Sequence, residues 1–235
     1  MSSILKNIEK WACDLVYLLF PEVCEVCMAP LVTGEKTICL KCLADMPYTD
    51  YHNKPENPVS QIFWGKVHVE MATALFYFAK GSKYRKLIHK LKYKGKREIG
   101  IFLGRELGAC IGKSDYFKGI DCIIPVPLHI SRQTKRGYNQ SAEIALGISQ
   151  VTGIPVKLHE LIRSQATETQ TKKTRDERWK NVSGKFQIAS PENLKGKHVL
   201  VVDDVITTGS TIEAVVETLL GVEGVTVSIA VVAKA

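Results

Sequence analysis

The sequence of 235 residues contains no internal repeat and no low-complexity tract, which excludes fibrous and repeat architectures. Its apolar fraction is ordinary, so a disordered chain is excluded as well. The first twenty residues lack an uninterrupted apolar segment, because Lys6, Glu9, Lys10 and Asp14 interrupt them. We therefore expect no secretion signal, no membrane insertion and a cytoplasmic location.

Length and local composition divide the chain into four parts. A chain of this length can bury one sizeable core together with a small appendage. Apolar residues recur at helical spacing from Ile4 to Leu19. Pro47, Pro55 and Pro58 stand among polar residues with no apolar period, which is typical of a boundary. We expect an N-terminal amphipathic helix in residues 1–20, a four-cysteine module in 21–46, a linker in 47–60 and the main domain in 61–235.

Four of the cysteines follow a metal-site spacing. Cys24, Cys27, Cys39 and Cys42 form two CxxC pairs with eleven residues between them. This spacing lets two short turns meet around one tetrahedral ion, which favours Zn²⁺. Two disulfides and an iron-bound site are the alternatives, although no export signal indicates an oxidising compartment. Four thiolates leave no position for water or substrate, so we expect a structural role.

Positive charge is concentrated in one stretch. The net charge is +8, and residues 80–97 hold nine Lys or Arg and no acid, which leaves 32 − 9 = 23 basic against 24 acidic residues elsewhere. Such a patch suits phosphates of a small ligand or of nucleic acid, with Lys90, Lys92 and Lys94 as candidates for nucleic-acid contact. The alternative is a solvated helix face on which the intervening apolar residues pack inward.

The second half alternates short apolar runs with helical patterns. Uniformly apolar strands are expected at 121–127, 198–202 and 225–233, and amphipathic helices at 139–151 and 211–220. Strands covered on both faces and joined by helices predict a parallel sheet in an open α/β fold. Ligands of such folds bind beyond the carboxyl ends of the strands.

The most informative residues stand at one such strand end. The sequence predicts a strand ending in Asp203 and Asp204, a loop from Val205 to Gly209, and a helix beginning near Ser210. Backbone amides at a helix start form an anion site, and Gly209 allows close approach. Hydroxyl donors for a terminal phosphate are supplied by Thr207, Thr208, Ser210 and Thr211. The loop contains no lysine and is no P-loop. A capped helix without any ligand is the alternative.

Residues 199–211 closely resemble the diphosphoribosyl-binding fingerprint of type I phosphoribosyltransferases. Three further segments resemble successive signatures of the ComF family, so the resemblance covers nearly the whole chain. It implies an open parallel sheet of the type I phosphoribosyltransferase fold, an N-terminal zinc-ribbon-like module and an association with DNA uptake in natural transformation. The three segments are KLKYKG at 90–95, PVP at 125–127 followed by RGYNQSAEIA at 136–145, and the stretch 163–186.

The resemblance also assigns roles by position. It makes Asp203 and Asp204 the ribose-side acids, and it places phosphoribosyl diphosphate against the loop and the strand end before it. Arg132 and Arg136 lie where a diphosphate needs positive charge. The expected ligand contacts are Val205, Thr207, Thr208, Gly209, Ser210, Thr211, Pro125, Val126, Pro127, Arg132 and Arg136.

Residues 165–181 resemble the loop that closes over the diphosphate, with Lys172 and Arg175 as its catalytic cations. The implied reaction displaces pyrophosphate from C1 of the ribose by a nitrogen nucleophile, with Mg²⁺ on the diphosphate. Transferases for 6-oxopurines have an acid where Thr207 stands, so this loop looks more like the orotate and amidophosphoribosyl types. The competing hypothesis is a binding protein that holds a phosphoribosyl compound while its basic stretch engages single-stranded DNA or a DNA-uptake helicase.

Overall fold

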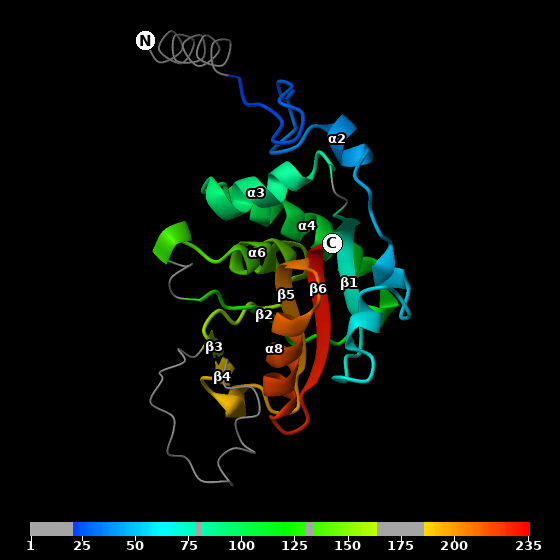
Figure 1. Cartoon of the computed structure of the whole chain (residues 1–235), viewed down its shortest axis with the longest axis vertical. Coiled ribbons are helices and arrows are strands. Elements are labelled where there is room, and N and C mark those ends of the chain that lie inside the picture. Colours follow the sequence, from blue (N-terminus) through cyan, green and yellow to red (C-terminus); the bar gives the residue numbers. More distant parts are fainter. Residues whose placement is uncertain (1–20, 79–80, 130–133, 164–185) are drawn as a thin grey trace, which may run out of the picture.

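The computed structural model describes residues 21–78, 81–129, 134–163 and 186–235 (Figure 1). The amphipathic helix expected in residues 1–20 lies outside the described residues, as do Arg132, Lys172 and Arg175. In the part of the chain that the structure describes, no helix is long and apolar enough to cross a membrane.

A four-stranded parallel sheet forms the centre of the molecule, as the apolar runs predicted. Its order is β1-β6-β5-β2, and every neighbouring pair is parallel. Both central strands are buried almost throughout because helices cover both faces (Figure 1). The strands are β1 (Ala72–Tyr77), β2 (Cys122–Pro125), β5 (His198–Ile206) and β6 (Thr226–Lys234).

The two faces of the sheet bury separate apolar cores. Along β5, Leu200 and Val202 join a core with α3, α4 and α6, whereas Val199 and Val201 join a core with α8. This follows from the two-residue period of a strand. The α-helices are α2 (Leu40–Ala44), α3 (Arg85–Tyr93), α4 (Arg97–Lys113), α6 (Gln140–Thr152) and α8 (Ser210–Leu220).

Helices α4 and α6 cross at glycines. A Cβ atom built on Gly104 would lie 2.1 Å from the carbonyl oxygen of Ile144, and one on Gly147 would lie 2.3 Å from that of Ile101. The backbones therefore touch directly, which no larger residue would allow. This close crossing holds α6, and with it the first turn of α6, over the carboxyl ends of β2 and β5.

The segment expected as a linker is packed against the domain. Tyr51 and Val59 of this segment, and Phe63 just after it, are buried in the core on the α8 side. The side-chain amide of Asn57 donates to the carbonyl of Ala72 at 2.8 Å, which fixes the segment to β1. The 3₁₀ helix η1 (Tyr51–Asn53) lies within the segment, and η2 (Ser60–Phe63) begins at its last residue.

A small antiparallel pair lies apart from the main sheet. Strands β3 (Leu161–Arg163) and β4 (Phe186–Ile188) pair with each other, and the stretch expected as a closing loop connects them. Two further 3₁₀ helices are η3 (Asp115–Phe117) and η4 (Pro191–Asn193).

Candidate phosphoribosyl site

The β5–α8 loop, residues 207–209, lies beyond the carboxyl end of β5. Gly209 has φ of +78° and precedes α8, whose first turn has no side-chain cap among the described residues. Thr207, Thr208, Ser210 and Thr211 are exposed around a hollow of about 60 Å³. Free amides, hydroxyls and a positive helix end are the groups that bind a phosphate.

The strand before this loop is longer than expected. β5 does not end at Asp204 but continues to Ile206, and Val205 pairs with Ala233 of β6. β5 continues past Asp204 because β6 runs to Lys234 and supplies backbone partners for the two extra residues. The acid pair therefore lies within β5, and only residues 207–209 remain to form the loop before α8.

The acids have different partners. Asp203 accepts hydrogen bonds from the Ser141 hydroxyl and the Asp204 amide, both at 2.8 Å. Burial and the neighbouring Asp204 carboxylate raise the pKa of Asp203 to about 7, although the two hydrogen bonds work in the opposite direction. Asp204 is paired with Lys92 of α3, with 2.9 Å between Oδ1 and Nζ.

The end of β2 lies beside the acid pair. The amide of Val126 donates to the Val202 carbonyl at 2.9 Å, and the Val126 carbonyl accepts from the Asn139 side chain at 3.0 Å. Asn139 also caps α6. Pro125 and Val126 are buried, and Pro127 is half-buried. The first turn of α6 is thereby held where Ser141 reaches Asp203.

A cationic pocket of about 560 Å³ opens beside this site. It is lined by Lys92, Tyr93, Gly95, Lys135 and Arg136. Arg136 donates to Gln140 Oε1 at 2.7 Å, and its guanidinium lies 5.2 Å from the centre of the Tyr93 ring. Among the described residues that line the pocket there is no acid, so it favours an anion.

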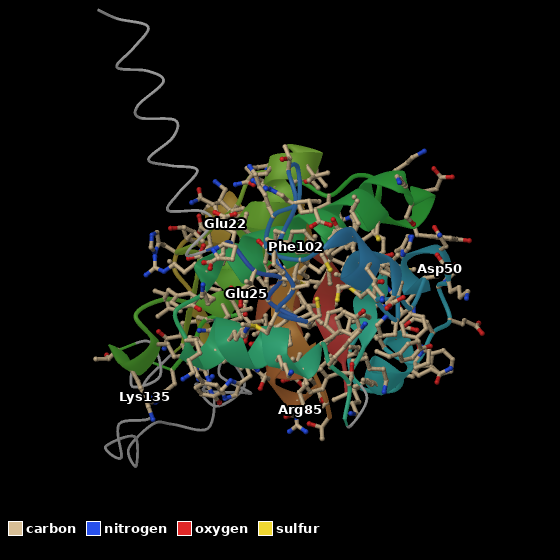
Figure 2. The ribbon with its side chains drawn as sticks, turned by 90° about the horizontal axis from the view of Figure 1, so that it is seen from above. Glu22, Glu25, Asp50, Arg85, Phe102 and Lys135 are labelled. Atoms are coloured by element: carbon tan, nitrogen blue, oxygen red, sulfur yellow. The ribbon has the colours of Figure 1, made fainter. Side chains whose placement is uncertain are left out.

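The basic stretch is distributed over several partners instead of forming one surface. Lys90 contacts Glu25 Oε2 at 2.6 Å, Lys92 contacts Asp204, and Lys94 is exposed. Of the three lysines predicted to contact nucleic acid, Lys90 and Lys94 therefore line one hollow on α3, whereas Lys92 is directed to the sheet. Figure 2 views this side from above, with Glu25 near the middle and Arg85 and Lys135 at the periphery. Three of the nine cations fix the cysteine module: Lys83 to Asp45, and Lys90 and Lys96 to Glu25.

The four predicted metal-ligand cysteines lie together. Their Sγ atoms are all within 4.8 Å of one another, and those of Cys27 and Cys39 are 3.7 Å apart. Zn–S bonds of about 2.3 Å in a tetrahedron require S–S edges of about 3.8 Å, so the arrangement fits Zn²⁺. Burial and the neighbouring thiols raise the pKa of Cys42 to about 12. Against the effect of burial, backbone hydrogen bonds lower that of Cys24 to about 7.

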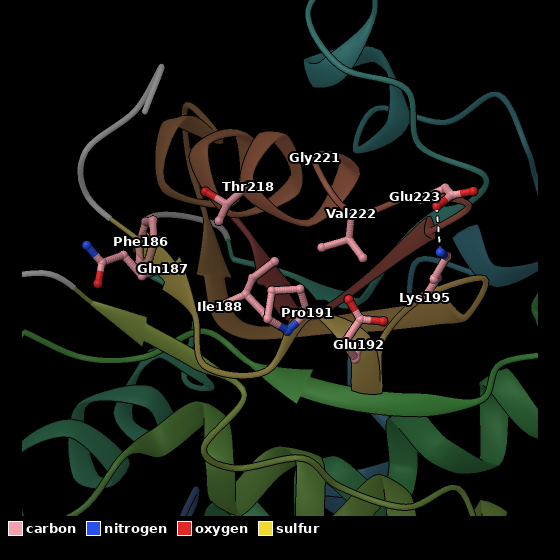
Figure 3. A pocket seen from close by; sticks show the side chains of 10 residues that line it. All are labelled: Phe186, Gln187, Ile188, Pro191, Glu192, Lys195, Thr218, Gly221, Val222 and Glu223. Atoms are coloured by element: carbon pink, nitrogen blue, oxygen red, sulfur yellow. Dashed lines mark ion pairs between the residues drawn. The ribbon is translucent and has the colours of Figure 1, made fainter. Parts of the chain in front are cut away.

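Another hollow, of about 530 Å³, lies at the far end of α8 (Figure 3). Ile188, Thr218 and Val222 line it, and an ion pair between Lys195 and Glu223, at 2.7 Å, stands at its edge. Because Thr218 follows the loop by more than two helical turns, this hollow is separate from the acid pair.

Comparison with known proteins identifies the family. The family profile of the phosphoribosyl transferase domain matches residues 117–235. The DNA utilization protein YhgH of Shigella flexneri is 29% identical over 227 residues, covering 86% of this chain and 92% of that protein. Competence protein F of Haemophilus influenzae is 34% identical over 147 residues, which cover 60% of this chain and 64% of that protein. The chain belongs to the ComF family of phosphoribosyltransferase-domain proteins. A solved structure similar to this ComF-family chain is glutamine phosphoribosylpyrophosphate amidotransferase from B. subtilis. The sequence identity is 24% and the TM-score is 0.42, and the match covers 60% of this chain and 30% of that one.

Sequence reasoning missed three contacts at the site. Lys92 was assigned to nucleic acid but lies on Asp204. Ser141 was unassigned but donates to Asp203. Ile62 was placed next to a linker but lies behind Gly209, where its Cγ2 would be 2.5 Å from an added Cβ. Ser141 had a sequence signal, since it stands in the RGYNQSAEIA segment, whereas the other two contacts depend on the fold.

Proposed function

We propose that this ComF-family protein binds phosphoribosyl diphosphate together with Mg²⁺. The observation that carries the proposal is the acid pair near the carboxyl end of β5, which is followed two strand residues later by a loop with an uncapped helix start. Carboxylates accept hydrogen bonds from ribose hydroxyls, and the helix start takes the 5′-phosphate.

Each predicted residue has a part in this proposal. Thr207, Thr208, Gly209, Ser210 and Thr211 surround the 5′-phosphate, with Val205 in the strand beneath them. Asp203 and Asp204 face the ribose hydroxyls. The diphosphate lies toward Pro125, Val126, Pro127 and Arg136, and Arg132, Lys172 and Arg175 would reach it from segments outside the described residues.

The chemistry that fits the site is pentosyl transfer. The bond between C1 and the diphosphate oxygen breaks, a bond from C1 to the acceptor nitrogen forms, and the acceptor proton leaves to solvent or to a carboxylate. The chain's residues position the ribose and stabilise charge. Mg²⁺, when bound, neutralises the diphosphate through its oxygens and through water.

Calorimetric titration tests the binding proposal. Phosphoribosyl diphosphate should bind the wild-type protein in the presence of Mg²⁺ and bind far more weakly without it. The double variant Asp203→Asn with Asp204→Asn should lose about 100-fold or more in affinity, because two charged hydrogen-bond acceptors are removed at about 1.5–3 kcal/mol each. Unchanged affinity of that variant would remove the proposal.

Protein stability should depend on pH through Asp203. Its folded pKa, about 7, is above the unfolded value of about 3.9, so the folded state binds the extra proton between these values. The free energy of unfolding should therefore fall as pH rises through this window. Asp203→Asn should remove that fall, measured by urea unfolding at pH 5 to 8. Asp115→Asn, at an exposed carboxyl whose pKa the Lys118 ammonium lowers, should leave it in place.

We also propose a structural Zn²⁺ held by Cys24, Cys27, Cys39 and Cys42. The fit of their Sγ atoms to a tetrahedron supports it. Metal analysis of the purified protein should give one zinc per chain, and Cys42→Ser should lower that content sharply. A full zinc content in this variant would count against the assignment.

A second function has separate support. The names of the two relatives refer to DNA utilization and competence, which supports a role of this protein in DNA uptake. We propose that it acts in the cytoplasm, with single-stranded DNA or a helicase as partner. The outer face of α3 suits DNA better than Lys90 and Lys92, which are paired with acids. Arg85, Lys86, His89, Tyr93 and Lys94 are exposed there, and the His89 and Tyr93 rings lie 5.0 Å apart.

Binding of a single-stranded oligonucleotide should fall steeply with salt. The triple variant Arg85→Ala, Lys86→Ala, Lys94→Ala should weaken it about tenfold and reduce the salt slope. Lys118→Ala, on the exposed turn of η3, is the control and should change neither. Salt-independent binding would exclude this surface.

A further inference from the structure

Lys92 differs from the other paired lysines of its stretch. Lys83, Lys90 and Lys96 pair with acids of the cysteine module, whereas Lys92 pairs with an acid of the sheet. Its side chain is 23% exposed and that of Asp204 is 11% exposed, so the pair is largely withdrawn from water. A lysine in such a place is either a permanent counter-ion or a mobile ligand-binding group.

The same side chain lines the cationic pocket. Lys92 is one of the five residues around this pocket, together with Lys135 and Arg136. Its ammonium therefore lies between two environments, the Asp204 carboxylate and a space whose other charged groups are cations. Arg136 is held in place by Gln140 and by the Tyr93 ring, so the pocket has one fixed guanidinium, and Lys92 and Lys135 supply flexible ammonium groups.

Ligand binding at the acid pair would compete with this ion pair. Ribose hydroxyls that donate to Asp204 occupy the same carboxylate that Lys92 now contacts. A lysine stem has four rotatable bonds and its ammonium three donors, so it can leave one acceptor for another nearby. A diphosphate supplies strong acceptors and satisfies the cations of the pocket at the same time.

We propose that Lys92 is a diphosphate-binding residue supplied by α3, held on Asp204 before the phosphoribosyl ligand arrives and transferred to its diphosphate in the cationic pocket afterwards. This inference rests on the proposed function. It gives α3 a direct part in ligand binding, and it explains why one lysine of this helix reaches across to the sheet.

Three ligands separate the two roles of Lys92. The probes are Mg²⁺ pyrophosphate, ribose 5-phosphate and phosphoribosyl diphosphate, titrated by calorimetry into the full chain. Lys92→Met should weaken both diphosphate-containing probes by about 10- to 100-fold, the loss expected for one charged hydrogen bond. The affinity of Lys92→Met for ribose 5-phosphate should stay within about twofold of the wild-type affinity. Lys118→Met, at an exposed lysine that pairs with Asp115 and lines neither proposed site, should change none of the three.

A double-mutant cycle keeps the test valid if Lys92→Met alone folds poorly. Asp204→Asn removes the acid that Lys92→Met would leave unpaired, so the double variant has no uncompensated charge. In the Asp204→Asn background, adding Lys92→Met should still weaken pyrophosphate binding about tenfold or more. Equal pyrophosphate affinity with and without Lys92 would overturn the inference, as would an equal loss for ribose 5-phosphate. Failure of the wild type to bind phosphoribosyl diphosphate would instead contradict the proposed function.

Discussion

Gly209→Ala is expected to weaken binding of phosphoribosyl diphosphate by about tenfold or more. The residue has φ of +78°, a conformation that costs an alanine roughly 1–2 kcal/mol. Its new Cβ would also lie 2.5 Å from Ile62 Cγ2 and 3.4 Å from the Phe63 ring. Because both neighbours belong to a packed turn, the loop itself must move, and its amides leave the position that a phosphate requires.

Gly119→Ala is the matched control for this loop. Gly119 has φ of +75°, so the backbone strain is the same, but no atom lies within 4 Å of an added Cβ. This variant should lose about 1 kcal/mol of unfolding free energy and keep its ligand affinity. Calorimetry measures ligand affinity and urea unfolding measures stability, so the two variants together separate backbone strain from displacement of the loop. If Gly209→Ala bound ligand as the wild type does, the loop would not be the phosphate site.

Gly104→Ala should destabilise the whole protein by about 3 kcal/mol or more. The added methyl would lie 2.1 Å from the Ile144 carbonyl oxygen, 2.9 Å from the Gly147 Cα and 2.9 Å from the Ile144 carbonyl carbon. Backbone atoms cannot rotate away, so the two helices must separate and leave poorly packed space between them. At about 2–4 °C per kcal/mol, Tm should fall by roughly 6–12 °C.

Gly112→Ala, on the same helix, should instead stabilise the protein. Its Cβ would meet only the Thr152 Cγ2 at 4.0 Å, and alanine is the better helix former by about 1 kcal/mol. Differential scanning calorimetry of the two variants therefore compares the same chemical change at a contact and away from it. Equal Tm values would show that the close helix crossing contributes nothing to stability.

The sequence predicted well what depends on neighbours along the chain. The apolar runs located β2, β5 and β6, and the acid pair with its glycine and hydroxyls located the loop, because each signal is contained in a few consecutive residues. Positions fixed by distant partners were not predictable. Val205 continues β5 because β6 continues beside it.

Charge was the least predictable property of the basic stretch. Composition gave nine cations without an acid, yet Lys90 and Lys92 find acids 65 and 112 positions away in the chain. No local pattern contains such pairings. The linker shows the same limit, because Asn57 has no apolar period around it, yet its side-chain amide donates to the β1 backbone.

The cysteine module shares its apolar core with α3 and α4, since Cys24, Val26 and Cys42 pack in one cluster with Leu87 and Leu91. The Tyr84 hydroxyl also donates to the Cys42 carbonyl at 2.7 Å. The module is therefore not an independent domain that could be removed or exchanged alone. Cutting it away would uncover the helix that carries Lys92, so a shortened transferase domain should be prone to aggregate, and exchanging modules between relatives would require redesign of the surface of α3 as well.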